Sequence, residues 1–165
     1  MIAFKIAAMP LPTGFTIRRA TTSDLEVLVQ HRRAMFHDMG YSDDSALDSM
    51  AAKFRVWLLE RMNSGDYLAW LATAPDASVA AGAGLWLMDW PPHMVGKSAR
   101  RGNILNVYTE ENFRRRGLAR ELMKEVLHWC RDNSVDTVIL HASPAGRDLY
   151  DELGFKPTNE MRLML

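Results

Sequence analysis

The chain has 165 residues, of which 48% are hydrophobic and 24% are charged, values that are ordinary for one globular domain. Its formal net charge is +0, so no overall field favours nucleic acid or an anionic membrane, and both are excluded as expected partners. The single cysteine, Cys130, excludes an internal disulfide and is compatible with a reducing compartment.

The first ten residues, MIAFKIAAMP, are apolar, but Lys5 interrupts them and Pro10 ends them. Without a basic segment followed by an apolar core, this stretch does not resemble a signal peptide, and no apolar run approaches the roughly 18 residues of a membrane span. We therefore expect an N-terminal extension over residues 1–13, a single domain over residues 14–165, and a cytoplasmic location.

The first half of the chain alternates between strand and helix patterns. Residues 14–20 alternate as a strand does, and a helix follows them. Thr21 or Thr22 could cap this helix, and Ser23 with Glu26 also fits a capping box.

Glycine marks the end of each of the first two predicted helices. The first helix is expected to stop at Gly40, and a second covers roughly residues 45–63 before Gly65. Two strands follow, over residues 67–74 and 79–88, and then a long loop with two prolines.

The second half contains a strand, a helix with an apolar stripe, a strand, a short helix and a last strand. Their predicted ranges are 103–109, 116–130, 137–142, 145–153 and 160–165. The central strand–helix–strand unit favours two neighbouring parallel strands, whereas the three strands up to residue 109 favour an antiparallel meander. We predict a mixed α/β fold of the α+β type, with a mainly antiparallel central sheet and about four helices.

The sequence RRRG lies where the strand ending at Thr109 gives way to a helix. Arg114, Arg115 and Arg116 precede Gly117. The free N–H groups of a helix start favour phosphate, and guanidinium groups add donors that match phosphate oxygens. Three positive charges at the positive end of a helix are unfavourable unless an anion binds there. The alternative is a solvated helix start, because such a string also arises by chance.

A second candidate segment is HASPAGRDLYDELGF, after the strand over residues 137–142. Ser143 can cap the helix, with Pro144 in its first position. Tyr150 lies just past the end of that strand, where ligands of α/β sheets bind, and its phenol is a proton donor. The alternative is an amphipathic tyrosine that only covers the sheet.

Together these segments resemble the GNAT superfamily of acyl-CoA-dependent N-acyltransferases. RRRGLA is similar to the family's Arg/Gln-x-x-Gly-x-Gly/Ala motif, and ILNVYT to the strand that pairs with pantetheine. GRDLYDELGF is similar to the C-terminal signature A-x-x-L-Y-x-x-L-G-F. The residues at the fixed positions are Arg114, Gly117, Ala119, Tyr150, Gly154 and Phe155. The order of elements fits over about residues 14–165.

The resemblance implies a site for acetyl-CoA and no metal. The parallel strands would splay, so that backbone groups pair with the pantetheine arm, and the N–H of Val107 or its neighbour would stabilise the oxyanion. Tyr150 would protonate the leaving thiolate. The implied donor-site residues are Val107, Tyr108, Thr109, Arg114, Arg115, Arg116, Gly117, Leu118, Ala119, Arg120, Ser143, Gly146 and Tyr150.

The chain departs from the family pattern in three places. Many members have an asparagine where Ser143 stands and an alanine where Gly146 stands. Some members use a glutamate as general base within the central strand, where this chain has Asn103. A water chain, a nearby histidine or an amine that arrives neutral must then serve, with Glu110 at the strand end as a further candidate.

In this family the acceptor site is usually shaped by the first two helices and nearby loops. His31 or Arg32 would orient an anionic or polar acceptor there, although a solvated helix face is the alternative. Trp86 could form an aromatic rim or belong to the core. His93 and His141 are further candidate bases. No spacing of histidine, cysteine and carboxylate indicates a metal site.

The expected function is transfer of an acetyl group from acetyl-CoA to a primary amine of a small molecule or peptide. The alternative is a non-catalytic acyl-CoA-binding sensor or scaffold, which the missing carboxylate in the central strand favours and Tyr150 disfavours. A nucleic-acid-binding module does not fit zero net charge. A homodimer is expected by analogy alone.

Overall fold

The computed structural model describes residues 11–165, so most of the expected extension over residues 1–13 lies outside the described residues. Among the described residues, the chain forms two compact units, residues 11–141 and residues 142–165. The larger unit carries the sheet and three of the α-helices.

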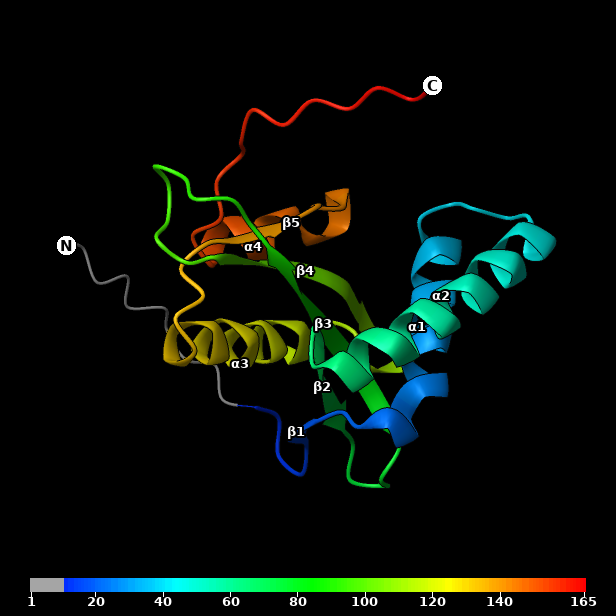
Figure 1. The fold of residues 1–165 in the computed structure, drawn as a ribbon. Helices are drawn as coiled ribbons and strands as arrows, with labels where there is room; N and C mark the ends of the chain where they lie inside the picture. Colours follow the sequence, from blue (N-terminus) through cyan, green and yellow to red (C-terminus); the bar gives the residue numbers. More distant parts are fainter. Residues whose placement is uncertain (1–10) are drawn as a thin grey trace. The chain divides into compact units, whose positions relative to one another are not determined.

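One five-stranded sheet organises the larger unit, with its strands in chain order. The first three junctions are antiparallel, and the β4–β5 junction is parallel, which confirms the predicted mixed sheet (Figure 1). The strands are β1 (Thr16–Arg19), β2 (Tyr67–Thr73), β3 (Val79–Asp89), β4 (Arg100–Thr109) and β5 (Val138–Leu140).

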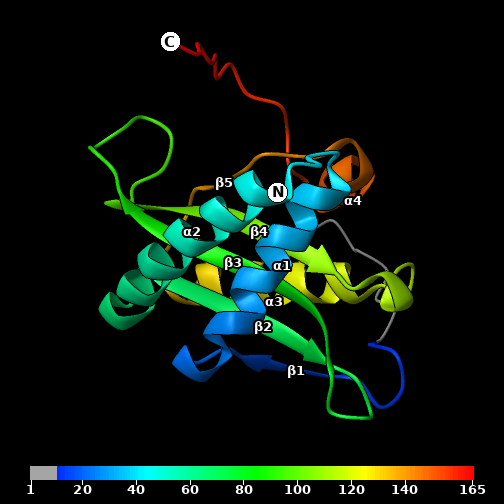
Figure 2. The ribbon, with the colours of Figure 1, turned by 90° about the vertical axis from the view of Figure 1, so that its right-hand side faces the viewer.

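The helices of this unit cover both faces of the sheet. Helices α1 and α2 lie against one face and α3 against the other (Figures 1 and 2). Successive side chains of β2 point to opposite faces of the sheet and so contact different helices. Leu71 packs in the hydrophobic cluster with α1 and α2, whereas the Trp70 ring lies 6.2 Å from the Trp129 ring of α3. The bounds are α1 (Leu25–Asp38), α2 (Asp44–Ser64) and α3 (Leu118–Asp132).

No helix in the described part of the chain has both the length and the apolar character needed to cross a membrane. Two short 3-10 turns, η1 (Thr22–Asp24) and η2 (Glu111–Phe113), lead into α1 and away from β4.

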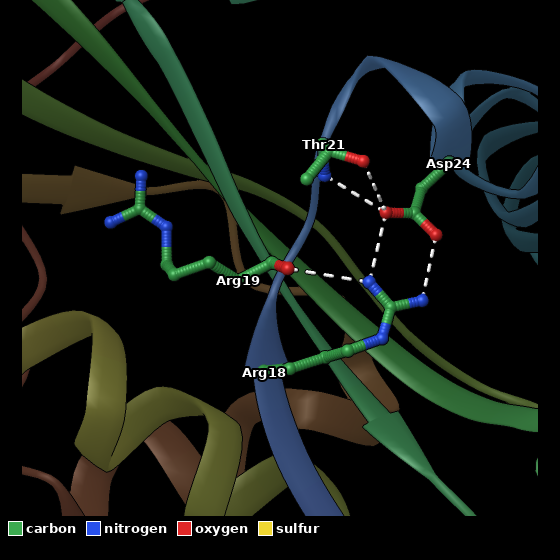
Figure 3. Close-up of polar contacts among 4 residues, drawn as sticks. All are labelled: Arg18, Arg19, Thr21 and Asp24. Atoms are coloured by element: carbon green, nitrogen blue, oxygen red, sulfur yellow. Dashed lines mark hydrogen bonds and ion pairs between the residues drawn. The ribbon is translucent and has the colours of Figure 1, made fainter.

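The junction of β1 and α1 is fixed by a carboxylate that accepts four hydrogen bonds (Figure 3). The Thr21 N–H donates to the Asp24 side chain at 2.8 Å, and the Arg18 guanidinium donates to both Asp24 oxygens at 2.7 and 2.9 Å. Thr21 is therefore the cap, and its capping-box partner is Asp24. The alternative box of Ser23 with Glu26 is not formed.

Two strand boundaries differ from the sequence prediction. Strands β3 and β4 form a longer hairpin than expected, because the Trp90 N–H still donates to the Ala99 carbonyl at 2.8 Å and the loop shrinks accordingly. The predicted strand over residues 160–165 is wrong: these residues are in no helix or strand, and Met161 and Leu163 are exposed. Alternating apolar residues favour a strand, but a strand also needs a hydrogen-bonding partner.

The smaller unit contains the 3-10 turn η3 (Pro144–Gly146) and helix α4 (Arg147–Glu152). The Ser143 side chain accepts a hydrogen bond from the Gly146 N–H at 3.2 Å, with Pro144 next in the chain. The predicted cap is thus confirmed.

A glycine in β3 makes room for the buried side chain of Tyr67. A Cβ atom built on Gly84 would lie 1.9 Å from the Tyr67 hydroxyl oxygen. We expect Gly84→Ala to lower the free energy of unfolding by about 1–3 kcal/mol, because the tyrosine must leave its rotamer. Urea unfolding measures this, and unchanged stability would show that the site relaxes without cost.

Candidate active site

A bulge interrupts β4 near the middle of the sheet. The pairing of β3 with β4 shifts between Gly82 and Gly84, so one residue of β3 lies opposite two of β4, Asn106 and Val107. Asn106 has a φ of 56°, in the left-handed region that asparagine tolerates better than most residues. Bulges re-aim side chains and are frequent beside active sites, which makes this position the centre of the candidate site.

Beyond the bulge, one edge of β4 runs past its parallel neighbour. The β5 pairing ends where Ile104 meets Leu140, whereas β4 continues to Thr109. Among the described residues, no strand pairs with this edge after Ile104. The backbone of Val107 and Tyr108 therefore lies along a stretch that an extended ligand could join as an added strand.

The start of α3 has the features of an anion site. Its N-cap is Gly117, with a φ of 80°, and no side chain caps the helix. Arg115 is also left-handed, with a φ of 60°. A Cβ on Gly117 would meet no atom within 4 Å, so the space beside this backbone is open. The uncapped amides and the helix dipole together favour a phosphate here.

The three arginines of the loop differ in their partners. Arg114 forms an ion pair with Asp38, at the end of α1, and its Nε donates to the Thr109 carbonyl at 3.0 Å. Arg116 donates to the Asn112 carbonyl at 3.0 Å. Arg115 has no hydrogen bond or ion pair within residues 11–165. Arg114 and Arg116 therefore hold the loop, and Arg115 is the one left open toward a ligand.

His31 of α1 is buried against the bulged strand. Its ring lies 5.2 Å from the Tyr108 ring, and its Nε2 lies 3.4 Å from Glu110 Oε1. Burial lowers the pKa of His31 to about 4, so the imidazole is neutral at physiological pH. The Glu110 side chain is 36% exposed, so its carboxylate reaches both the histidine and solvent.

The depressed pKa of His31 makes stability depend on pH. An unfolded histidine takes up a proton near pH 6.5, whereas the folded His31 does so only near pH 4. Between these values the unfolded state binds more protons, so the free energy of unfolding decreases as the pH is lowered. We expect His31 to lower the free energy of unfolding by about 2 kcal/mol between pH 7 and pH 5. Urea unfolding of wild type and His31→Phe isolates this effect, since other groups titrate alike in both; equal pH slopes would contradict it.

Next to His31, the side chain of Arg32 reaches the bulge itself. Its Nη1 donates to Asn106 Oδ1 at 2.6 Å, and Asn106 Nδ2 donates in turn to the Tyr67 hydroxyl at 3.0 Å. The Arg32 guanidinium carbon also lies 4.5 Å from the Phe54 ring centre. Both candidates in α1, His31 and Arg32, therefore contact residues of β4. Asn106 and Tyr67 were missed in the sequence, where an asparagine inside a strand was the only signal.

The remaining acceptor-side candidates lie elsewhere in the larger unit. The Trp86 ring packs 5.2 Å from Trp57 in the cluster beneath α2. His141 is exposed just after β5, and His93 lies exposed in the β3–β4 loop. Cys130 is buried and its pKa is raised to about 11 by burial, which fits a core residue better than a nucleophile. The described residues contain no group of three or more potential metal-ligating side chains.

Tyr150 lies in the smaller unit, buried, with its ring 6.0 Å from the Phe155 ring. Burial raises its pKa, so the phenol remains protonated at neutral pH and can donate its proton. A Cβ on Gly146 would lie 2.8 Å from Tyr150 Cε2. The glycine that replaces the usual alanine of the family thus leaves room for this ring.

The chain matches known acetyltransferases in sequence and structure. The model of the Acetyltransferase (GNAT) family matches residues 28–155. The crystal structure of a GCN5-related N-acetyltransferase from Ralstonia eutropha JMP134 is 35% identical, with a TM-score of 0.86, over 92% of this chain and 99% of that one. No curated protein sequence matches.

Two further solved structures share the fold at lower identity. A protein from Clostridium acetobutylicum described as a predicted acetyltransferase, determined with acetyl-CoA, is 24% identical, with a TM-score of 0.82, over 92% of this chain and 96% of that one. Glucosamine-6-phosphate N-acetyltransferase from Arabidopsis thaliana is 18% identical, with a TM-score of 0.60, over 92% and 97%. With the bulged strand, its open edge and the uncapped helix start, these matches lead to one conclusion: the chain belongs to the GNAT acetyltransferase family.

Proposed function

We propose that this protein is an N-acetyltransferase that moves an acetyl group from acetyl-CoA to a primary amine of a small molecule or peptide. The observation that carries the proposal is the edge of β4 beyond Ile104, which no strand within residues 11–165 pairs with. This edge contains the bulge, and a short loop joins it to the uncapped start of α3. The acetyl-CoA in the Clostridium acetobutylicum structure supports this choice of donor.

On the donor side, the backbone of Val107, Tyr108 and Thr109 pairs with the pantetheine arm. The Val107 N–H at the bulge polarises the thioester carbonyl and stabilises the oxyanion that forms on it. The amides of residues 114–120 hold the pyrophosphate, and Arg115 adds a free guanidinium. The resemblance to the family also assigns Ser143 and Gly146 to the binding of acetyl-CoA.

In the chemical step, the neutral amine attacks the carbonyl carbon, so that a C–N bond forms and the C–S bond breaks. Tyr150 gives its proton to the departing thiolate. Glu110 takes the proton that the ammonium loses on becoming the neutral nucleophile, and the neighbouring His31 holds the carboxylate in place. The nitrogen gives a second proton to solvent as the amide forms. Glu110 thus supplies the base that the central strand lacks at Asn103.

The proposal is tested by incubating the protein with acetyl-CoA and a panel of primary amines while release of free thiol is measured. We expect acetyl-CoA to raise the melting temperature and at least one amine to accelerate thiol release. Binding without turnover would favour the alternative sensor or scaffold module. No shift in melting temperature at millimolar acetyl-CoA would contradict both.

We also propose that residues 14–165 act as one acetyltransferase domain in the cytoplasm and form a homodimer. The family match over residues 28–155 supports the first point, and light scattering of the purified protein tests the last. The small-molecule acceptor is supported by the fold shared with glucosamine-6-phosphate N-acetyltransferase.

A further inference from the structure

Arg32 is a partly buried cation that lies among neutral groups. Its guanidinium carbon lies 4.5 Å from the Phe54 ring centre and 5.0 Å from that of Phe36, and it donates a hydrogen bond to the amide oxygen of Asn106. Its Nε is buried and has no hydrogen-bond partner among the described residues. Within residues 11–165, no carboxylate lies at ion-pair distance from it. Removal from water without a counter-charge is costly, so this guanidinium favours an anion that binds beside it.

The next residue of α1 provides the contrast. Arg33 donates to Asp44 at 2.8 Å and to Asp48 at 2.7 Å, so its charge is matched within the protein. Arg32 and Arg33 differ in partner although they are neighbours in one helix. Of these two neighbours, Arg32 is therefore the one whose charge no carboxylate within residues 11–165 matches.

The location of Arg32 ties this anion to the acceptor. The guanidinium group donates a hydrogen bond to Asn106, the residue before Val107. The residue before Arg32 in the helix is His31, which contacts Glu110. We propose, resting on the acetyltransferase function above, that the acceptor is an amine that also carries a carboxylate, with the carboxylate bound by Arg32. A carboxylate fits better than a phosphate dianion, because one guanidinium matches one negative charge.

The experiment compares pairs of amines that differ in one charged group: amino acids with their amides, amino sugars with their 6-phosphates, and monoamines with diamines. Thiol release gives kcat and KM for each. Hydrogen bonds between a guanidinium and a carboxylate should raise kcat/KM for an amino acid about 10- to 100-fold above its amide, mainly through KM. Diamines should be poor acceptors.

Variants locate the effect at Arg32. In Arg32→Gln, KM for the amino acid should rise about 10- to 100-fold and the preference over the amide should vanish. In Arg32→Lys, which keeps the charge but lacks the planar fork, part of the preference should remain. Arg33→Gln is the matched control and should keep the full preference. Circular dichroism and the melting shift with acetyl-CoA check that each variant is folded.

Each outcome is decisive. Equal rates for amino acids and their amides, or a preference that survives in Arg32→Gln, would overturn the carboxylate site and leave acetyl transfer standing. A preference for phosphorylated amines that Arg32→Gln removes would replace the carboxylate by a phosphate. If no amine in the panel is acetylated, the proposed function fails, and this inference fails with it.

Discussion

Replacement of Tyr150 by phenylalanine should lower kcat about 100-fold or more, since a general acid typically contributes a factor of 10²–10⁴. The affinity for acetyl-CoA should change little, because the ring and its contact with Phe155 remain. Burial keeps the Tyr150 phenol protonated, and phenylalanine removes only that proton source. Steady-state kinetics together with titration of acetyl-CoA separates the two quantities.

The control for this variant is Tyr41→Phe, because the Tyr41 side chain is 58% exposed. It should retain the wild-type rate. An unchanged rate in Tyr150→Phe would show that water or another residue protonates the thiolate.

Glu110→Gln should lower kcat at neutral pH about 100-fold, because the carboxylate that accepts the proton of the amine is lost while the shape is kept. The difference in kcat between the variant and the wild type should narrow as pH rises toward the pKa of the acceptor amine, because the amine then binds without its extra proton. A purely structural role of Glu110 would not produce this convergence. The measurement is a pH–rate profile of variant and wild type with the same amine.

Glu111→Gln is the matched control, since Glu111 is the next residue in the chain and is exposed. It should follow the wild-type profile. A Glu110→Gln variant that stays equally impaired at every pH would contradict the role of Glu110 as base and leave water or His31 to take the proton.

Local features of the fold were predictable from the sequence. The apolar periodicity of the helices, the Ser143 cap and the helix start at Gly117 all depend on residues close together in the chain, and the structure has each of them. The strand–helix–strand order of the second half predicted the parallel pair β4–β5. The prediction of a last strand over residues 160–165 was wrong, because the composition of a segment does not show whether a neighbouring strand can form hydrogen bonds with it.

The acceptor side was predictable only in part. His31 and Arg32 were candidates by type and position in the first helix, but a solvated helix face was the default description of such residues. Their contacts with Glu110 and Asn106 join α1 to β4 and to the residue after it, across at least 74 residues of the chain, and depend on where the strand bulges. The ion pair of Arg114 with Asp38 depends on the same long-range geometry.

The bulge at Asn106 also fixes the alignment of β4 along β3. A regular strand can slide by one residue against its neighbour, which turns every side chain to the opposite face. Here the extra residue and its left-handed backbone lie opposite the segment between Gly82 and Gly84, where the absence of two side chains leaves room for Tyr67 and His31. The bulge thereby fixes the register of β4, so that Tyr108 faces His31 of α1 and Glu110 follows just after the strand.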